Sequence, residues 1–319
     1  MGRTPPVSIG LPVYNGEKYL TQSIESVLNQ DFTDFELLIS DNASIDSTWD
    51  ICRHYAERDK RIRLHKNERN IGAINNFNLV FQQTTSPYFM WHSHDDLLPP
   101  NYIGPCYRFL AENKDYVLCC SRTTFIDDTG NETYSSLYDY NVESDDIIQR
   151  YSNCFQQSWH INLAVYGLIR RNILQELDLT RKVHGTDLIV LLQLSLMGKF
   201  HQLTEPTRYY RRRTYQSAKE AIEWYPKQLQ GDNYTVVLLP HLRMLSILFN
   251  IIAHADLARK IRLRLIKCTL KEKAALTMWL KYDAMHLIAF CSYRSQVMYN
   301  ILTKVYRYVS KRDNTYPRV

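Results

Sequence analysis

Short apolar runs of β-rich composition alternate with helical segments along the first 125 residues, and this alternation constrains the fold more than any other feature. The strand-like runs are residues 7–13, 35–40, 62–65 and 88–91, and the helical segments between them are 17–29, 47–57 and 75–83. Parallel strands must be joined by a crossover, which is usually a helix. The pattern therefore predicts an α/β fold with a mostly parallel, Rossmann-like central sheet flanked by helices.

Further elements extend this pattern to about residue 230. Those that we expect are a helix at 101–113, a strand at 116–120, a long polar loop or lid at 127–146, a helix at 187–197 and a strand at 200–210. A helical tail is expected to begin near Trp224. We therefore divide the chain into a main domain, 1–230, with parts 1–125 and 126–230, and a C-terminal helical extension, 231–319.

The net charge of +6 is unevenly distributed along the chain. The last 89 residues carry 15 Lys and Arg against 5 Asp and Glu, whereas the first 230 residues carry a net charge of −4. A basic region suits an anionic lipid surface, nucleic acid or an acidic glycan, and charge alone does not choose among them. The composition, 45% apolar and 23% charged, is that of a globular chain and argues against disorder.

Cysteine usage and the lack of long apolar segments indicate in which cellular compartment we expect the protein. The seven cysteines are an odd number without a C-x-x-C pair, which is typical of reduced, packed thiols in a cytosolic protein. Residues 1–6 contain no apolar signal region, and the most apolar stretch, 236–253, is interrupted by Pro240, His241 and Arg243. We therefore expect neither secretion nor a membrane span.

Polar residues stand at the carboxyl ends of the predicted strands, where open α/β sheets bind their ligands. These residues are Tyr14, Asp41, Asn42, Asp95 and Asp96. A dinucleotide is disfavoured, because the turn after the first strand has one glycine where G-x-G-x-x-G requires three. Asp41 and Asn42 suit a ribose hydroxyl or a base N–H, although the same residues favour a simple Asx turn.

The acidic pair Asp95-Asp96 follows a buried strand, where two carboxylates repel each other unless a positive charge offsets them. Mg²⁺ and Mn²⁺ favour carboxylate and phosphate oxygens, so the pair predicts a divalent cation held together with substrate phosphates. A solvated turn before Pro99 is the alternative. His92 and His94 flank the pair, and for either one a packed or hydrogen-bonded ring is favoured over a ligand.

Three ordered motifs in the first 125 residues carry a family resemblance. They are the strand Val7–Asn15, the segment from Ser26 to Asp46, and the loop Asn70–Ala73 with Asn75-Asn76. Together they resemble the inverting family 2 glycosyltransferases of the GT-A fold. The resemblance implies a nucleotide-diphosphate sugar donor, favouring a UDP-sugar, with residues 1–125 binding the donor and 126–230 providing the acceptor side and the catalytic base.

The resemblance also assigns roles to individual residues. The residues that it places around the nucleotide are Pro12, Tyr14, Glu17, Asp41, Asn42, Gly72, Asn76, Asp95 and Asp96. Asp96 is the expected direct ligand of Mn²⁺ or Mg²⁺, and Asp95 is the partner of the ribose or of a metal-bound water. Ser93 stands where the commoner D-x-D-D motif has its first carboxylate, so the metal site should need the donor diphosphate to be complete.

A later acidic residue fits the position of the family's general base. Asp187 follows Gly185-Thr186 at the start of a helix, and would take the proton of the acceptor hydroxyl as that oxygen attacks the anomeric carbon. A favourable place for an acid in a first helical turn is the alternative reading. The segment Arg208–Arg213 would bring basic residues near the diphosphate, or would be a solvated basic run.

The acceptor side is marked by aromatic residues, since aromatic faces suit sugar rings. Trp159-His160 and the stretch Tyr134–Tyr151 are the candidates. The processive Q-x-x-R-W signature is absent from the sequence, which favours transfer of single sugars. Residues 259–268 form a basic amphipathic segment, which suits an anionic membrane surface or a helix packed on the core.

The sequence therefore predicts a metal-dependent inverting glycosyltransferase that moves one sugar to a lipid, glycolipid or polysaccharide-precursor hydroxyl. We expect it in the cytoplasm, either free or bound peripherally at the cytoplasmic face of a membrane, with no nucleic-acid partner and with its oligomeric state open. A non-catalytic scaffold that keeps the fold is the alternative from another class. A nucleotidyltransferase is less favoured, because Gly16-Glu17-Lys18 is a poor phosphate loop.

Overall fold

The computed structural model describes residues 3–135, 140–158, 163–179, 185–212, 239–272 and 276–284. The chain divides into two compact units, which are considered one at a time below. The first unit comprises Met1–Lys182 and Val190–Tyr234, and the second comprises Val183–Ile189 and Thr235–Val319. The boundary predicted near residue 230 and the helix start predicted near Trp224 lie outside the described residues.

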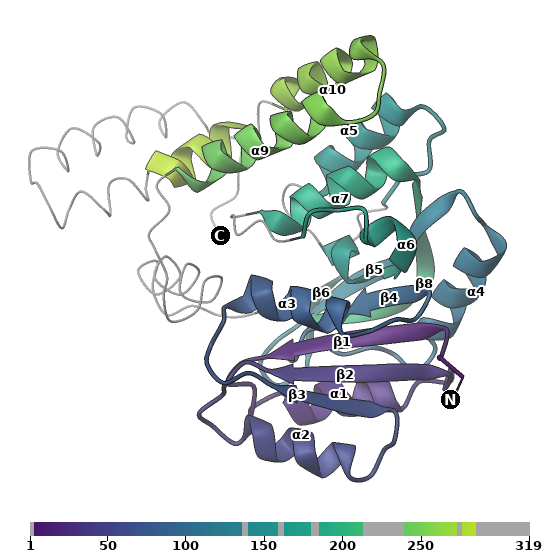
Figure 1. Cartoon of the computed structure of the whole chain (residues 1–319), viewed down its shortest axis with the longest axis vertical. Coiled ribbons are helices and arrows are strands. Elements are labelled where there is room, and N and C mark those ends of the chain that lie inside the picture. Colours follow the sequence, from purple (N-terminus) through teal and green to yellow (C-terminus); the bar gives the residue numbers. More distant parts are fainter. Residues whose placement is uncertain are drawn as a thin grey trace, which may run out of the picture. The chain divides into compact units, whose positions relative to one another are not determined.

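Strands and helices alternate through the first unit (Figure 1). The strands are β1 (Val7–Val13), β2 (Phe35–Asp41), β3 (Ile62–Lys66), β4 (Tyr88–Trp91), β5 (Tyr116–Ile126), β6 (Glu132–Ser135), β7 (Leu168–Arg170) and β8 (Lys199–Arg211). The helices are α1 (Leu20–Leu28), α2 (Thr48–Ala56), α3 (Ala73–Gln82), α4 (Ile103–Glu112), α5 (Ile147–Ser158), η1 (Leu163–Tyr166), α6 (Arg171–Leu174) and α7 (Thr186–Met197), the last of which begins in the second unit.

The described strands form one mixed sheet in the order β3-β2-β1-β4-β7-β5-β6, with β8 paired to β5. The strands β1, β2, β3 and β4 are parallel to their neighbours in this group, and β5 and β8 are also parallel. The antiparallel strands are β6 and the short β7. This confirms the predicted α/β fold with a mostly parallel sheet.

Helices cover both faces of the sheet. Alternate residues of β1, beginning with Val7 and Ile9, pack in one core with buried residues of α1, α2 and α4. The other face of β1 contacts α3, and there Gly10 is required: a Cβ at this position would lie 2.6 Å from Cγ2 of Val80. The close approach of α3 to the sheet therefore depends on the missing side chain (Figure 1).

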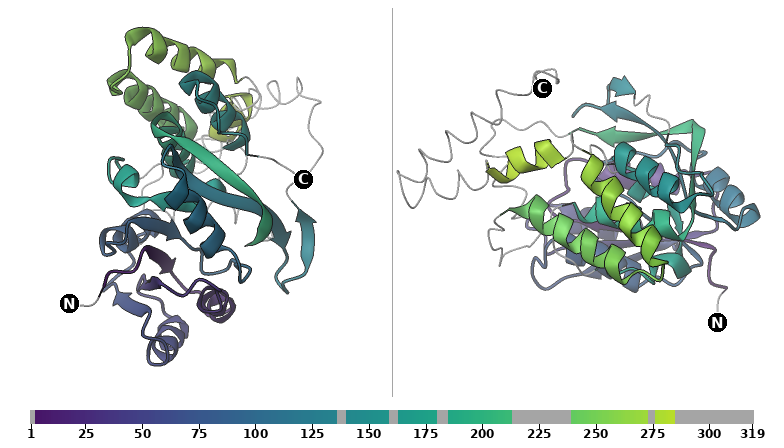
Figure 2. Two further views of the ribbon diagram at one scale, coloured as in Figure 1. Left: turned by 90° about the vertical axis from the view of Figure 1, so that its right-hand side faces the viewer. Right: turned by 90° about the horizontal axis from the view of Figure 1, so that it is seen from above.

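The later part of the first unit departs most from the predicted elements. β5 continues to Ile126, well beyond the predicted end at residue 120, because it pairs along its length with β8 (Figure 2). The predicted polar loop at 127–146 contains the strand β6, and its residues 136–139 lie outside the described residues. The helix α5 and the strand β7 were not predicted.

Helices make up the described part of the second unit after the start of α7. They are α9 (Pro240–His254), α10 (Arg259–Lys271) and a helical segment at 276–284. His241 and Asp283 join the first and last of these, with 2.8 Å between His241 Nδ1 and Asp283 Oδ1. No helix among the described residues is long and apolar enough to cross a membrane.

Candidate functional site

The carboxyl ends of β1, β2 and β4 meet at one edge of the sheet. The register pairs Val13 with Asp41 and Gly10 with Trp91, so the segments that leave these three strands are neighbours. Pro12 is buried within β1, and Tyr14 follows the strand with a half-buried side chain. The structure thus brings the predicted residues of these three strands to a common rim.

Asp41 is fully buried at the end of β2, and its two carboxylate oxygens differ in their surroundings. Oδ1 accepts a hydrogen bond of 3.1 Å from the backbone N–H of Ser44, three residues on, so the side chain closes a turn related to the anticipated Asx turn. Oδ2 is buried and has no hydrogen-bond partner among the described residues. Because a buried carboxylate oxygen without a donor is costly, Oδ2 indicates a donor supplied by a ligand.

Asn42 and Asn76 belong to a buried hydrogen-bond network. Asn67 Nδ2 donates to Oδ1 of both residues at 3.0 Å, and Asn42 Nδ2 donates to Asn70 Oδ1 at 2.8 Å. Asn70 in turn accepts the N–H of Gly72, whose positive φ of 84° suits glycine. The two asparagines therefore position the loop at 70–72, which is a structural task beside any contact with a nucleotide.

Glu17 ties the turn after β1 to the start of α2. Its Oε2 accepts the N–H of Ser47 at 3.1 Å, while its own N–H donates to Asp46 Oδ2 at 3.2 Å. Asp46 Oδ1 accepts the N–H of Thr48. Ser47 stands at the N-cap position of α2 and makes no side-chain cap hydrogen bond.

Asp96 is fully buried and its two carboxylate oxygens both have protein partners. Arg208 of β8, itself 2% exposed, forms an ion pair with Oδ2, and the backbone N–H of Arg211 donates to Oδ1 at 3.0 Å. The guanidinium of Arg208 also lies 4.4 Å from the ring centroid of Tyr166. The positive charge that offsets the acidic pair is thus supplied by an arginine of the chain.

Burial dominates the ionisation of this pair. It raises the pKa of Asp96 to about 7, and Arg208 opposes this shift. Burial is the largest influence on Arg208 and acts against its charge, but Asp96, Tyr102 and Tyr166 together outweigh it and the pKa of Arg208 is raised. The raised pKa of Asp96 favours its neutral form, whereas the raised pKa of Arg208 favours its charged form, so the two shifts disagree on whether an ion pair forms. We assign the ion pair, because a guanidinium is not deprotonated in proteins and this one contacts Oδ2 directly.

Asp95 is only half-buried, in contrast to Asp96. Its Oδ1 accepts a hydrogen bond of 2.5 Å from Ser93, the residue that replaces the first carboxylate of the commoner motif. Among the described residues no group of three or more His, Cys, Asp or Glu is arranged to hold a metal ion. Asp95 is therefore the more accessible carboxylate of the two, and metal binding at this acidic pair stays a prediction.

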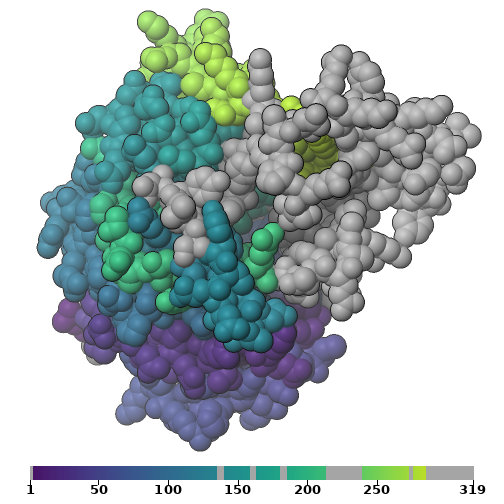
Figure 3. All heavy atoms as spheres, turned by 180° about the vertical axis from the view of Figure 1, so that it is seen from behind, coloured from purple at the N-terminus to yellow at the C-terminus, as the bar shows by residue number. Residues whose placement is uncertain are grey.

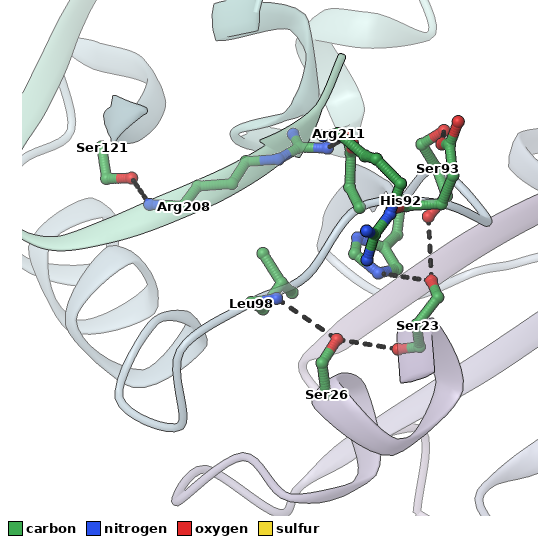
Figure 4. Close-up of polar contacts among 10 residues, drawn as sticks. Ser23, Ser26, His92, Ser93, Leu98, Ser121, Arg208 and Arg211 are labelled. Carbon is green, nitrogen blue, oxygen red and sulfur yellow. Dashed lines mark hydrogen bonds and ion pairs between the residues drawn. The ribbon is translucent and has the colours of Figure 1, made fainter. Parts of the chain in front are cut away.

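Ser23 of α1 holds the segment before the acidic pair (Figure 4). Its hydroxyl donates to the carbonyl of Ser93 at 2.9 Å and lies 3.0 Å from Nε2 of His92. Since the serine proton is used on Ser93, Nε2 carries the proton of a neutral His92, whose pKa burial and Arg208 lower. His92 is thus a packed, hydrogen-bonded ring, and its buried Nδ1 has no partner among the described residues.

Arg211 connects the acidic pair to two other segments. Its side chain donates to the carbonyls of Asp95 at 2.9 Å and Asp127 at 2.7 Å, and to Gln22 Oε1 at 3.0 Å. Arg208 and Arg211 are both buried, so the reading of this segment as a solvated run is wrong for these two. Arg212 is exposed, and Arg213 lies outside the described residues, as do Trp159 and His160.

Asp187 lies in the first turn of α7, as predicted. The residue keeps exposed surface, yet the protein around its carboxyl group raises its pKa to about 6 by desolvation. Gly185 precedes this turn with a φ of 75°, and a Cβ there would lie 2.3 Å from Sδ of Met244. The turn that presents Asp187 is therefore closely packed within the second unit.

The sheet order and the polar groups at its carboxyl edge define the class of this molecule: it is an α/β protein of the GT-A type. Comparison with known sequences narrows the class further. The chain belongs to the family described as glycosyl transferase family 2, whose family profile matches residues 8–178. The resemblance carried by the motifs of the first 125 residues is thereby confirmed.

Curated relatives agree with this family but match only part of their own length. An uncharacterized glycosyltransferase of Methanocaldococcus jannaschii is 35% identical over 129 residues, which are 40% of this chain and 44% of the relative. The glycosyltransferase GlyG of Streptococcus pneumoniae is 25% identical over 215 residues, which are 65% of this chain and 71% of that protein. For the first of these the matched part is less than half of the relative.

Solved structures show the same fold over nearly the whole chain. TarS 1–349 of Staphylococcus aureus in complex with UDP-GlcNAc has a TM-score of 0.64 at 17% identity, covering 98% of this chain and 93% of that one. A mannosyltransferase of Pyrobaculum calidifontis in complex with GDP-Man and Mn²⁺ has a TM-score of 0.55 at 15% identity and covers 95% of this chain and 79% of that one. At these identities the likeness concerns the fold alone.

Proposed function

We propose that this chain transfers a single sugar from a nucleotide-diphosphate sugar, with UDP favoured as the nucleotide, to an acceptor hydroxyl with inversion of configuration. The observation that carries the proposal is the buried Oδ2 of Asp41, which has no donor among the described residues. It lies at the carboxyl edge of the sheet, where open α/β sheets bind ligands. The UDP-GlcNAc complex of the TarS neighbour supports the choice of donor.

On the donor side, Asp41 accepts a hydrogen bond from the nucleoside, and Tyr14 and Pro12 border the same pocket. Asn42 and Asn76 keep the loop at 70–72 in place through their shared network. Glu17 does the same for the turn after β1. In this proposal the nucleoside meets a preorganised rim, so little ordering entropy is lost when the donor binds.

The residues near the acidic pair fit a divalent cation bound together with the donor. Asp95 offers a half-buried carboxylate, whereas both oxygens of Asp96 already have protein partners. One protein carboxylate plus substrate phosphates is a usual coordination for Mg²⁺. The ion, when bound, would stabilise the negative charge on the departing diphosphate. We therefore propose Asp95 as the ligand and Asp96 as the buried anchor of its loop.

On the acceptor side, Asp187 is proposed as the general base. Its carboxylate takes the proton of the acceptor hydroxyl while the oxygen forms a bond to the anomeric carbon. The bond from that carbon to the diphosphate oxygen breaks with its electron pair on the leaving nucleotide. Desolvation raises the pKa of Asp187 to about 6, which brings a carboxyl closer to neutrality, where general bases are most effective.

The acceptor that we propose is a lipid, glycolipid or polysaccharide-precursor hydroxyl, met at the cytoplasmic face of a membrane. The basic C-terminal region is the feature that supports a location near anionic lipid. The domain roles follow the same proposal, with residues 1–125 on the donor side, 126–230 on the acceptor side and 231–319 as the basic extension.

The test is release of nucleotide diphosphate from a panel of nucleotide sugars with Mn²⁺ or Mg²⁺, with and without membrane lipid extract. We expect release from one donor, stimulated by the extract, and loss of release on adding a chelator. The matched control is Asp187→Asn, which should still bind UDP but lose turnover. No release from any donor, together with no binding of UDP, would instead favour a non-catalytic scaffold.

A further inference from the structure

We propose that one face of α10 is a docking surface for an anionic phospholipid bilayer. The surface consists of six exposed residues that we call the α10 stripe: Lys260, Leu263, Arg264, Lys267, Leu270 and Lys271. This inference deepens the proposed function, because it assigns the membrane contact to named side chains. It concerns the second unit alone and requires no particular placement of that unit beside the first.

The α10 stripe is continuous along the helix. Its members follow one another at intervals of three, one, three, three and one residues, and at 3.6 residues per turn they fall within an arc of about 120°. Four of them are cations, and α10 contains no acidic residue from Arg259 to Lys271. One side of the helix therefore presents positive charge along its whole length.

The opposite side of α10 is packed. Leu265 and Thr269 are fully buried, and Arg262 donates to the carbonyl of Ala253 at 2.5 Å, which fastens α10 to the end of α9. The two helices lie side by side (Figures 1 and 2), and their light-green atoms form part of the outer surface in the space-filling view (Figure 3). The helix thus already has its packing partner, and the α10 stripe is what remains exposed.

Two exposed leucines favour a lipid bilayer over another polyanion as the partner of the α10 stripe. Leu263 is 49% exposed and Leu270 is 52% exposed, seven residues apart on the same face. A helix that needs only to attract a polyanion has no use for apolar side chains among its cations. An interfacial helix needs both, because apolar side chains enter the acyl boundary while Lys and Arg remain with the anionic headgroups. The mixture therefore favours phospholipid over nucleic acid or an acidic protein.

The experiment uses the full chain and sedimentation with vesicles of phosphatidylcholine, with or without phosphatidylglycerol. We expect binding to the anionic vesicles only, and weaker binding as salt screens the cations. Reversing two charges with Arg264→Glu and Lys267→Glu should lower partitioning by about 25-fold or more, since each cation near an anionic surface contributes about fivefold. Replacing both leucines by glutamine should lower it about fivefold per leucine without changing the charge.

The matched control is Lys60→Glu with Lys114→Glu, which makes the same charge change at exposed positions of the first unit. This variant should partition nearly as the unchanged chain does. Equal loss in the control and the α10 variant would overturn the proposal, because net charge would then explain binding. So would full binding by the leucine variant, because charge alone would then hold the chain to the vesicles and the leucines would not enter the bilayer. Release of nucleotide diphosphate from the donor, measured without vesicles, should be unchanged in all three variants. A failure of this proposal can therefore be distinguished from a failure of the proposed activity.

Discussion

Replacement of Arg208 by methionine should destabilise the first unit strongly. The change keeps an unbranched side chain that suits a buried position, and it removes the only side-chain cation paired with Asp96 among the described residues, together with the contact on Tyr166. Asp96 would keep one donor, the backbone N–H of Arg211. Both partners of the pair are almost completely buried, so water cannot replace the lost cation.

Removing one partner of a buried ion pair costs about 3–5 kcal/mol. For a unit of this size, that loss lowers the midpoint of thermal unfolding by about 6–20 °C. Asp96→Asn combined with Arg208→Met removes both charges and should be more stable than Arg208→Met alone. A double-mutant cycle measures this coupling directly.

The loss should also depend on pH. Burial already raises the pKa of Asp96 from 3.8 to about 7, and removal of Arg208 raises it further. A carboxyl whose pKa is higher in the folded state contributes stability that is complete below the unfolded pKa and is lost as the pH rises through the folded pKa. The variant should therefore lose more stability at about pH 8 than at about pH 5, by thermal unfolding followed with circular dichroism. If the single substitutions simply add in the double variant, the ion pair is not formed.

Three further predictions concern the site. Asp41→Asn should weaken UDP binding by about 10–100-fold in calorimetry, because a charge-assisted hydrogen bond is lost, and unchanged affinity would contradict the role given to Oδ2. Asp187→Asn should lower kcat by about 10²–10⁴-fold at a nearly constant donor KM. With Asp187 present, kcat/KM should fall as the pH drops through about 6, because the base must be deprotonated, and a flat profile would count against it. Ser23→Ala should weaken Mn²⁺ binding in the presence of UDP about fivefold, since the segment before Asp95 loses its hydrogen bonds, whereas UDP binding without metal should persist.

The first four strands could be predicted because each one is a short apolar run bounded by turn residues. β1, β2 and β4 begin and end within about one residue of the predicted limits. β5 was predicted too short, since its second half is polar and is held in the sheet by β8, whose paired residues stand 82–85 positions later in the chain. The helix α5 was not predicted because its sequence is rich in polar residues, and the partners of its buried Arg150 include the distant carbonyl of Ser195.

At the site, the sequence indicated which residues lie at the rim but not how they are paired. The acidic pair was expected to need a positive charge, and a cation from solution was the natural choice. Arg208 lies 112 positions from Asp96, so no local pattern could reveal that the chain supplies this charge itself. The roles of Asn42 and Asn76 were hidden for the same reason, because Asn67, which joins them, stands in a loop without a recognisable motif.

Gly185 has a consequence for how the chain can be shortened. Its φ of 75° favours glycine, and a Cβ there would lie 2.3 Å from Sδ of Met244, so the turn that presents Asp187 packs directly against a side chain of α9. A fragment ending at residue 230 would keep Asp187 but would lose the packing of Met244 against this turn. The smallest piece of the protein that preserves this packing must therefore extend through α9.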